Sequence, residues 1–532
     1  MAAADGETWW RRGVFYQIYP RSFQDTDGDG IGDLRGIVER LDHLVWLGVD
    51  AVWLSPIYAS PMEDGGYDIT DHTAVDPVFG TLEDADALLA EAHRRGLRIV
   101  LDFVPHHTSH RHPWCIESRS DRGAKRRDWY VWRDPAADGG PPTNWRSISD
   151  ERPGSAWHLD ERTGQYQLAT FSPAQPDFNW ANPAVREAMA DVLRFWLDRG
   201  VDGFRIDMAT FLGSDEQFRD EETPAGGPPV DYVRDARYHF NRPEAKDHLR
   251  ELRAVVDGYP DRVLIAEMLY DSPIDVLVEF ARDAGIDLAA NFGLITQPFT
   301  AEAIAAYVEA YDEATEAGDV WPNWCLANHD MPRPTRLGWP TARTAMLLLL
   351  TLRGTPFIYY GDELGMPNVD VPPDRRDDRW SVSLAGVTRD AFRTPMRWDA
   401  GPNAGFCPPD SRPWLPVGDD HERVNVAVQR DDPGSMLHLT RRLLVLRRRT
   451  PALTVGTSTR MRGLPTGCLG FTRTARGQRM LVLCNLARRD ATVELTGVGP
   501  PRIVETTGAA ALTAAGAVVE LGAGSAIVLQ LP

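Results

Sequence analysis

The sequence predicts an α/β protein: a (β/α)8 TIM barrel with an inserted subdomain after strand 3 and a C-terminal antiparallel β domain. Three observations predict this fold. Short apolar runs alternate with amphipathic segments over most of the chain, which is typical of parallel strands joined by crossover helices. Polar residues directly follow several of these runs, as side chains at the mouth of a barrel do. After residue 450 the alternation gives way to short β-like runs.

The barrel elements are expected in the order of the chain. Six apolar runs are expected to be strands: residues 14–18, 51–54, 98–103, 203–206, 263–266 and 357–360. Five segments with apolar residues at helical spacing are expected to be helices: residues 34–47, 82–95, 183–199, 242–256 and 435–449. Thr81 followed by Asp84, and Asn182 followed by Pro183, are start signals for two of these helices.

Two irregular stretches interrupt the alternation and set the expected domain boundaries. Residues 104–174 are rich in Pro, Gly, Trp and charge and are too long for an ordinary loop, so we expect an inserted B subdomain. A second irregular stretch covers residues 361–430. The barrel is therefore expected to comprise residues 1–103 and 175–450, and a C-terminal β-sandwich domain to comprise residues 451–532.

Composition excludes several kinds of partner. The chain has 57 basic and 77 acidic side chains, and the net charge of −20 would repel a polyphosphate backbone or an anionic bilayer. We therefore expect no nucleic acid and no membrane partner, and a neutral small molecule fits better. The five cysteines are scattered, and the sequence shows neither a secretion signal nor an apolar run long enough to span a bilayer. These features predict a cytoplasmic protein.

Four acidic residues follow apolar runs and should converge on one barrel mouth: Asp102, Asp207, Glu267 and Asp330. Arg205 and Asp207 are two residues apart, so on a strand both side chains point the same way and the guanidinium would keep Asp207 ionised. Glu267 follows four apolar residues, and a less polar environment should raise its pKa. Two such carboxyl groups can hydrolyse a glycosidic bond. Each acid alone could equally be a strand-end residue in a salt bridge, whereas the ordered set favours catalysis.

With these residues the sequence resembles the ordered signature blocks of the α-amylase superfamily, glycoside hydrolase family 13. The resemblance covers nearly the whole chain. Further blocks place it in the oligo-1,6-glucosidase and α-glucosidase branch: residues 14–23, 48–58, 175–180, 354–363 and 393–399. The resemblance implies a retaining, exo-acting α-glucosidase that acts on short oligosaccharides through a covalent glucosyl-enzyme, without an organic cofactor.

The same resemblance implies the roles of individual residues. Asp207 corresponds to the nucleophile, Glu267 to the acid/base, and Asp330 to the third catalytic carboxylate, which grips sugar hydroxyls. The substrate-binding residues that it implies are Asp64, Tyr67, Asp102, His107, Phe171, Arg205, His329 and Arg393. Tyr67 is expected to be a platform under the glucose ring. Asp64 is expected to pair with Arg393 at the pocket floor, which would restrict the enzyme to exo action.

An acidic loop is the candidate metal site. Asp25, Asp27 and Asp29 alternate along the chain, and hard oxygen ligands at that spacing can surround Ca²⁺ or Mg²⁺. The loop is not an EF-hand, because its twelfth position is Gly36. The resemblance implies a structural metal held by Asp25, Asp27, Asp29, Asp33 and the carbonyl of Ile31. The alternative is an acidic turn without metal.

Three positions depart from the family pattern. His106 stands where Asn is common, Met208 where Val, Ala or Thr is frequent, and Arg397 where Gln is frequent. We expect Arg397 to alter the acceptor side of the pocket, and linkage preference stays open. A zinc site at His106, His107 and His110 is a weaker alternative.

Two other functions stay open at this point. One is an α-glucosyltransferase or sucrose-acting enzyme that uses the same covalent intermediate. A remote alternative is a non-catalytic family member, although such proteins usually lose the carboxylates that this chain retains. The sequence does not determine the oligomeric state.

Overall fold

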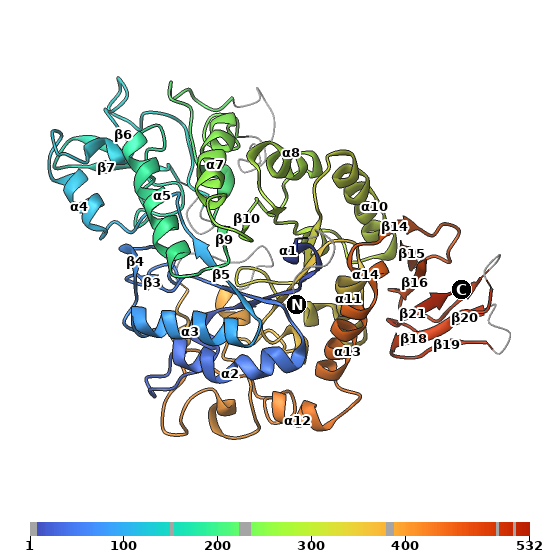
Figure 1. The fold of residues 1–532 in the computed structure, drawn as a ribbon. Coiled ribbons are helices and arrows are strands. Elements are labelled where there is room, and N and C mark those ends of the chain that lie inside the picture. The colour runs from blue at the N-terminus through green and yellow to red at the C-terminus, as the bar shows by residue number, and fades with distance from the viewer. Residues whose placement is uncertain (1–7, 149–153, 223–235, 379–387, 496–498, 514–517) are drawn as a thin grey trace.

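Eight parallel strands form a barrel in the computed structural model of the chain (Figure 1). The structure describes residues 8–148, 154–222, 236–378, 388–495, 499–513 and 518–532. The barrel strands are β1 (Phe15–Ile18), β2 (Ala51–Leu54), β5 (Arg98–Phe103), β9 (Gly203–Ile206), β10 (Val263–Ala266), β11 (Leu288–Ala289), β12 (Asn323–Cys325) and β13 (Thr355–Tyr359). Their order in the sheet is β11-β10-β9-β5-β2-β1-β13-β12. Each strand therefore lies beside the barrel strands that precede and follow it in the chain, except that β11 and β12 are the two ends of this order, and β13 lies beside β1.

A side chain bridges the gap between the first and last strands of that order. Asn323 of β12 donates a hydrogen bond from its amide to the carbonyl of Ala289 in β11, and its amide oxygen accepts one from the backbone N–H of Asn291 at 3.0 Å. The amide of Asn323 thus satisfies backbone groups that a ladder would otherwise pair. The barrel seam is therefore held by one buried asparagine.

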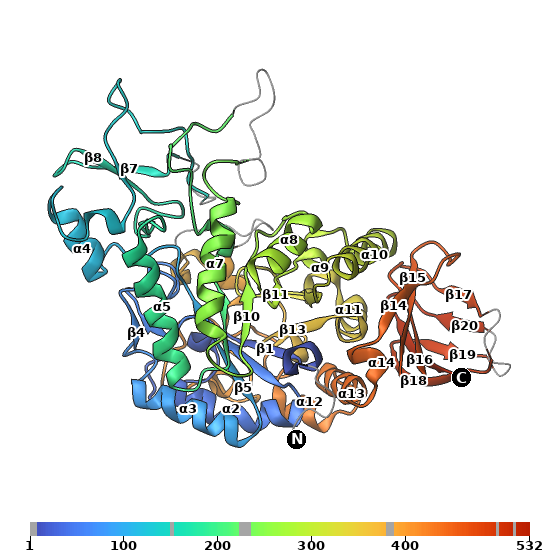
Figure 2. The same ribbon diagram turned by 45° about the horizontal axis from the view of Figure 1, so that its top comes forward.

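Helices surround the strands (Figures 1 and 2). The longer ones are α2 (Leu34–Leu47), α3 (Leu82–Arg94), α5 (Pro183–Asp198), α7 (Pro243–Val256), α8 (Ile274–Ala284), α10 (Ala301–Ala317), α11 (Trp339–Thr351) and α13 (Met436–Arg449). Thr81 and Asp84 form a capping box at the start of α3, and Asn182 caps α5 before Pro183, as predicted. Shorter helices are α1 (Trp9–Arg12), α4 (Pro113–Ser120), α9 (Gly293–Thr296), α12 (Val426–Asp431) and α14 (Pro451–Thr454).

Alternate residues of each barrel strand face opposite sides, and this places the polar groups. Phe15, Val100 and Ile265 belong to a small buried cluster within the barrel, whereas their sequence neighbours pack in a large cluster with the helices. Two residues further along the same inward face come Gln17, Asp102 and Glu267. The two-residue repeat therefore carries apolar side chains in the barrel interior and polar ones at its mouth.

The inserted subdomain follows the third barrel strand, as predicted. Its strands are β6 (Trp132–Arg133), β7 (Trp157–Asp160) and β8 (Gln165–Leu168), which form an antiparallel sheet in the order β6-β8-β7. Buried aromatic and aliphatic side chains, including Trp145 and Trp157, give it a core of its own. Between β2 and α3, the short strands β3 (Tyr58–Ala59) and β4 (Asp71–Val75) form a further antiparallel pair.

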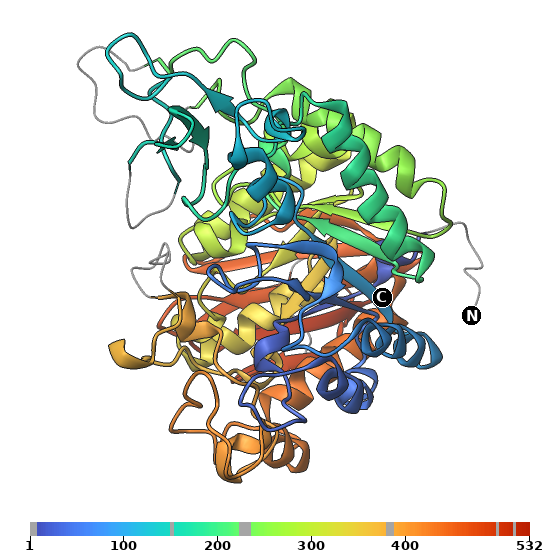
Figure 3. The same cartoon turned by 90° about the vertical axis from the view of Figure 1, so that its left-hand side faces the viewer.

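The C-terminal part is an antiparallel β domain, again as predicted. One sheet contains β14 (Thr457–Arg460), β15 (Cys468–Ala475), β16 (Gln478–Asn485), β21 (Ala526–Leu531) and β18 (Arg502–Thr507). The other contains β17 (Ala491–Glu494), β20 (Val518–Leu521) and β19 (Ala510–Leu512). Both sheets contribute to one apolar cluster. Figure 2 shows this domain and the inserted subdomain at opposite ends of the barrel, and Figure 3 shows the C-terminal strands behind it.

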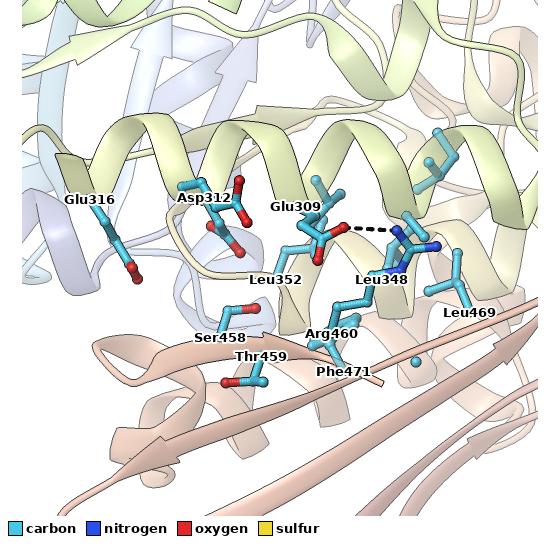
Figure 4. A pocket seen from close by; sticks show the side chains of 15 residues that line it. Glu309, Asp312, Glu316, Leu348, Leu352, Ser458, Thr459, Arg460, Leu469 and Phe471 are labelled. Atoms are coloured by element: carbon cyan, nitrogen blue, oxygen red, sulfur yellow. Dashed lines mark hydrogen bonds and ion pairs between the residues drawn. The ribbon is translucent and has the colours of Figure 1, made fainter. Parts of the chain in front are cut away.

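Two buried arginines connect the C-terminal domain to the barrel. Arg473 of β15 donates to the carbonyl of Thr351 at 2.6 Å, at the C-terminal end of α11. Arg447 of α13 donates to the carbonyls of Leu352 at 3.3 Å and of Leu453 in α14 at 2.9 Å. A cavity of about 170 Å³ lies beside this interface, between α10 and strands β14 and β15 (Figure 4). Within it, Arg460 and Glu309 form an ion pair at 2.9 Å.

The predicted elements are present in the structure, which adds others that were not predicted, among them two very short barrel strands and the helices α8, α10 and α11. The six predicted strands and five predicted helices are present. Strands β11 and β12, of two and three residues, were not predicted, because so few residues carry no periodicity. Within the described part of the chain, no helix combines the length and the apolar character needed to cross a bilayer.

Candidate active site

Arg205 lies at the centre of the barrel mouth and contacts three carboxyl groups. Its Nη1 atom is 2.6 Å from Asp102 Oδ1 and 2.8 Å from Asp207 Oδ1, and its Nη2 atom forms an ion pair with Glu267. Backbone hydrogen bonds fix two of the acids: Asp207 N donates to Phe103 O at 2.8 Å, and Glu267 N donates to Ile206 O at 2.9 Å. The parallel ladder therefore brings together residues that are far apart in the sequence, as predicted.

The charges of this cluster are unbalanced, with three carboxyl groups around one guanidinium. Burial raises the pKa of Asp207 and Glu267, and it raises the pKa of Asp102 to about 6, although Arg205 opposes the shift in each case. Asp207 and Glu267 also lie close enough to hydrogen-bond to one another. Three adjacent buried carboxyl groups around one guanidinium repel one another, which favours protonation of the cluster. The raised pKa of Asp207 runs against the expectation that Arg205 keeps this acid ionised.

A strained turn holds Glu267. Met208 directly follows Asp207 and has a left-handed backbone with φ of 42°, which is uncommon for a residue with a side chain. Its backbone N–H donates to Glu267 Oε2 at 3.0 Å. One oxygen of Glu267 is thus occupied by Arg205 and the other by this turn, so the carboxyl group has a defined orientation.

Tyr67 and His329 form a second layer of the site. Their rings stack with centroids 5.2 Å apart, and Tyr67 Oη lies 2.6 Å from His329 Nε2 and 2.9 Å from Asp102 Oδ2. Gln17 Nε2, which can only donate, is 2.9 Å from His329 Nδ1. Burial lowers the pKa of His329 well below its usual range, so the ring is neutral and its proton is on Nε2. Tyr67 can then donate to Asp102.

Asp330 lies between two arginines, and this corrects one predicted pair. Arg393 Nη2 is 2.7 Å from Asp330 Oδ1, and Arg389 Nη1 is 3.1 Å from the same oxygen. Asp64 was expected to pair with Arg393, but it pairs with Arg389 at 2.7 Å. Arg393 instead donates from Nε to the carbonyl of His329, and this contact together with the one to Asp330 engages its guanidinium. Burial alone would raise the pKa of Asp330, but the charges of Arg389 and Arg393 lower it, so Asp330 is ionised.

The remaining predicted ligand residues lie on the side of the inserted subdomain. His107 follows β5 and is buried, and the half-buried ring of Phe171 is 5.1 Å from it. Gln175 Nε2 is 3.1 Å from His107 Nε2 and 2.9 Å from Asp64 Oδ2. The structure therefore brings every predicted catalytic and substrate-binding residue into one connected network of contacts.

Sequence reasoning missed four members of this network: Gln17, Gln175, Tyr270 and Arg389. Tyr270 donates to Asp330 Oδ2 at 3.1 Å. Gln17 and Gln175 both lie within the signature blocks, and Arg389 precedes Arg393 by four residues. Gln17 and Gln175 could therefore have been proposed from their blocks, although their contact partners could not. Tyr270 and Arg389 lie outside the blocks.

The structure also shows the contacts of Arg397 and bears on the alternative of a zinc site. Arg397 was expected to alter the acceptor side, but it is buried, pairs with Asp420 at 2.7 Å and lies against Gly418. The zinc alternative is not supported: in the described part of the chain, the only group of three or more acids, cysteines or histidines arranged to hold a metal contains aspartates alone.

That group is the acidic loop. Ligand oxygens of Asp25, Asp27 and Asp29 all lie within 4.8 Å of one another. Burial and neighbouring acids raise the pKa of Asp25 and Asp29, so a cation would relieve their repulsion, and the donor set fits Ca²⁺ or Mg²⁺. Asp33 is outside this group, because its carboxylate caps α2 through Gly36 N at 2.7 Å and also accepts from Thr26 N at 2.6 Å.

The fold and the site together define a (β/α)8-barrel enzyme whose chemistry is performed by carboxyl groups. Comparison with known proteins then gives its family. The α-amylase catalytic-domain family model matches residues 17–456, and the chain belongs to this family.

Similar proteins cover nearly the whole chain. A probable α-glucosidase of Rhizobium meliloti (strain 1021) is 42% identical over 92% of this chain and 91% of its own length. An oligo-1,6-glucosidase of Parageobacillus thermoglucosidasius is 36% identical over 90% of this chain and 91% of its own length. The crystal structure of an α-glucosyl transfer enzyme superimposes with a TM-score of 0.90 and 37% identity, covering 99% of this chain and 100% of the other.

Proposed function

We propose that the enzyme is a retaining, exo-acting α-glucosidase, which hydrolyses the non-reducing-end α-glucosidic bond of short oligosaccharides through a covalent glucosyl-enzyme. The observation that carries the proposal is the guanidinium of Arg205, which contacts Asp207 and Glu267 at once. This closeness is compatible with the separation of roughly 5–5.5 Å that retaining enzymes use. The similarity to an α-glucosidase and an oligo-1,6-glucosidase supports the substrate class.

In this proposal Asp207 attacks the anomeric carbon while Glu267 donates its proton to the leaving oxygen. Glu267 then removes a proton from water, which attacks the glucosyl ester and releases glucose with its α configuration retained. Arg205 stabilises the ionised nucleophile, and Met208 N–H orients the acid. Asp330, kept ionised by Arg389 and Arg393, grips sugar hydroxyls and stabilises the oxocarbenium-like transition state.

Exo action is attributed to the ion pairs that would close the pocket floor. Arg389 links Asp64 to Asp330, and it also pairs with Asp378 at 2.8 Å. A floor built from a pair with Arg389, rather than with Arg393, would leave room for one terminal glucose. Tyr67 and Phe171 supply the aromatic surfaces beside that sugar.

Glucosyl transfer is the second candidate function. It is favoured by the likeness to the α-glucosyl transfer enzyme, which matches over the whole chain. The chemistry would be the same up to the glucosyl-enzyme, and a sugar or other hydroxyl would then replace water as acceptor. We propose no non-catalytic role, since all three catalytic carboxylates are present in the site.

We further propose a structural Ca²⁺ or Mg²⁺ held by Asp25, Asp27 and Asp29, with the Ile31 carbonyl as an additional donor and without the predicted ligand Asp33. The ion would stiffen the loop after β1 and take no part in the reaction. We also propose a cytoplasmic location, which the five free cysteines favour.

A product time course tests the function. Wild type and Asp207→Ala would be incubated with maltose, isomaltose, sucrose, trehalose and an aryl α-glucoside, and every product would be resolved. We expect wild type to release glucose and the variant to release none. New oligosaccharides or glucosides would assign transfer instead, and inertness of both proteins would reject the substrate class.

A further inference from the structure

Two adjacent histidines lie buried beside the pocket, and only one of them is a proposed sugar ligand. His106 is 4% exposed and His107 is 1% exposed, and their Nδ1 atoms are 3.2 Å apart. Burial lowers the pKa of His107 to about 3 and that of His106 well below its usual range, so both rings are neutral. Each ring then carries one proton, and one Nδ1 must donate to the other.

The neighbours of the pair decide which ring donates. Gln175 Nε2 is 3.1 Å from His107 Nε2, and an amide nitrogen can only donate. The orientation of that amide is fixed, because its nitrogen also reaches Asp64 and its oxygen accepts from Ser172 Oγ at 2.8 Å. His107 Nε2 is therefore an acceptor and its proton is on Nδ1. That Nδ1–H is shared between two acceptors, the backbone carbonyl of Tyr67 and His106 Nδ1.

The far side of His106 is held by an acid. With Nδ1 as acceptor, the proton of His106 is on Nε2, which faces Asp177 Oδ2 at 3.6 Å. Asp177 in turn accepts from Thr170 N at 2.9 Å and from the Thr170 hydroxyl, and that hydroxyl is 2.7 Å from His239 Nε2. The residues of this series of contacts, from His107 to His239, are all buried, so their polar groups have little freedom to exchange partners.

We propose that His106 is a positioning residue for glucose binding: through the Nδ1–Nδ1 hydrogen bond it helps to hold His107 in the tautomer whose Nε2 is an acceptor, for Gln175 Nε2 in this structure and for a sugar hydroxyl that replaces Gln175 when glucose binds. Asp177 Oδ2 lies 3.6 Å from His106 Nε2, beyond hydrogen-bond distance, so Asp177 acts on the His106 ring by electrostatic attraction to that N–H. The proposal rests on the proposed function, because it takes His107 to be a sugar ligand.

A double-mutant cycle tests whether His106 acts through His107. The variants are His106→Phe, His107→Ala and the pair, assayed for kcat/KM on an aryl α-glucoside. Phenylalanine suits the site because the His106 ring meets the edges or faces of Phe171 and Phe211 at 5.3 and 5.6 Å. Loss of one hydrogen bond predicts an approximately 3- to 10-fold fall in kcat/KM for His106→Phe. In the His107→Ala background the same change should have less than about a 2-fold effect.

An equal fall in both backgrounds would overturn the proposal, and so would unchanged kcat/KM in a folded His106→Phe protein. His110→Phe is the matched control, because His110 belongs to the same segment and its ring contacts the carbonyl of Ala174. It should leave kcat/KM unchanged. If His106→Phe does not fold, His106→Leu, which likewise offers no hydrogen-bond acceptor, replaces it in the same cycle with the same criteria.

Ring ¹⁵N spectra of histidine-labelled protein separate this proposal from the proposed function. The wild type should show a His107 signal, identified by its loss in His107→Ala, with Nδ1 protonated and Nε2 unprotonated. In His106→Phe this signal should become a tautomer mixture. An Nε2-protonated His107 in the wild type would overturn the assignment, whether or not the enzyme hydrolyses any glucoside.

Discussion

Arg205 and its carboxylates show how single residues set the chemistry of this site. One guanidinium contacts Asp102, Asp207 and Glu267, and each of these acids is less than a tenth exposed. The buried guanidinium binds an oxygen of each of the three carboxyl groups, but its single positive charge does not balance three negative charges. This imbalance favours a protonated carboxyl group in the cluster, and a pair with one protonated and one ionised acid is the arrangement in which one acid can attack while another donates.

Glu267 gives a pH prediction at this scale. Because burial raises its pKa, Glu267 stays protonated to a higher pH than a free glutamate, and kcat/KM should fall as pH rises through that raised pKa. Glu267→Gln cannot ionise, so the phenol burst from an activated aryl α-glucoside should lose this alkaline limb. Maltose hydrolysis should fall about 10²- to 10⁴-fold.

Stopped-flow bursts and steady-state assays across pH would check both effects. A Glu267→Gln burst that keeps the wild-type alkaline limb would assign that limb to another group. Glu39→Gln, on the outer helix α2, is a matched control that should leave both measurements unchanged.

At the scale of elements, the barrel depends on a side chain where two very short strands meet. Asn323→Ala would leave the Ala289 carbonyl and the Asn291 N–H without their partner. Since both groups are buried, we expect the free energy of unfolding to fall by about 2–3 kcal/mol. Urea denaturation would measure it. Gln217→Ala, at an exposed position, should change it by less than about 0.5 kcal/mol, and an equally small effect of Asn323→Ala would mean that backbone contacts alone hold the seam.

The loop between β1 and α2 gives a prediction about metal. Chelation with EDTA should lower the melting temperature, because a cation between Asp25, Asp27 and Asp29 binds only the folded loop. The value of kcat at 25 °C should not change, since the loop takes no part in the chemistry. Asp27→Asn should abolish the EDTA effect. A melting temperature that is the same with EDTA and with excess Ca²⁺ or Mg²⁺ would favour the metal-free acidic turn.

At the scale of the whole molecule, buried arginines join the barrel to the C-terminal domain. None of the hydrogen bonds that the structure describes for them has a carboxylate as acceptor. Arg473 donates to the carbonyls of Thr351 and Gly456, and burial lowers its pKa to about 9. Its charge faces the carbonyl end of α11, where the helix dipole favours a cation. The two parts are thus coupled through backbone groups that need this donor.

Arg473→Met should therefore weaken the coupling of the two parts. Removing the donor leaves two buried carbonyls unsatisfied, and we expect a loss of about 2–4 kcal/mol. Calorimetry should show that one cooperative transition becomes two. Arg479→Met, on the exposed side of β16, should leave one transition in place. A single, unshifted transition in Arg473→Met would show that apolar packing alone couples the domains.

The sequence by itself determined the order of the barrel elements, the strand ends that carry Asp207 and Glu267, and the caps of α3 and α5. These features depend on residues within a few positions of one another, where periodicity and capping chemistry act. The tertiary structure alone decided which arginine Asp64 meets, because Asp64 and Arg389 are 325 residues apart. It also decided that Asp33 caps α2 and that His106 contacts His107 and Asp177. Such partners follow from how distant strands and loops converge in space, and no local pattern in the chain encodes that geometry.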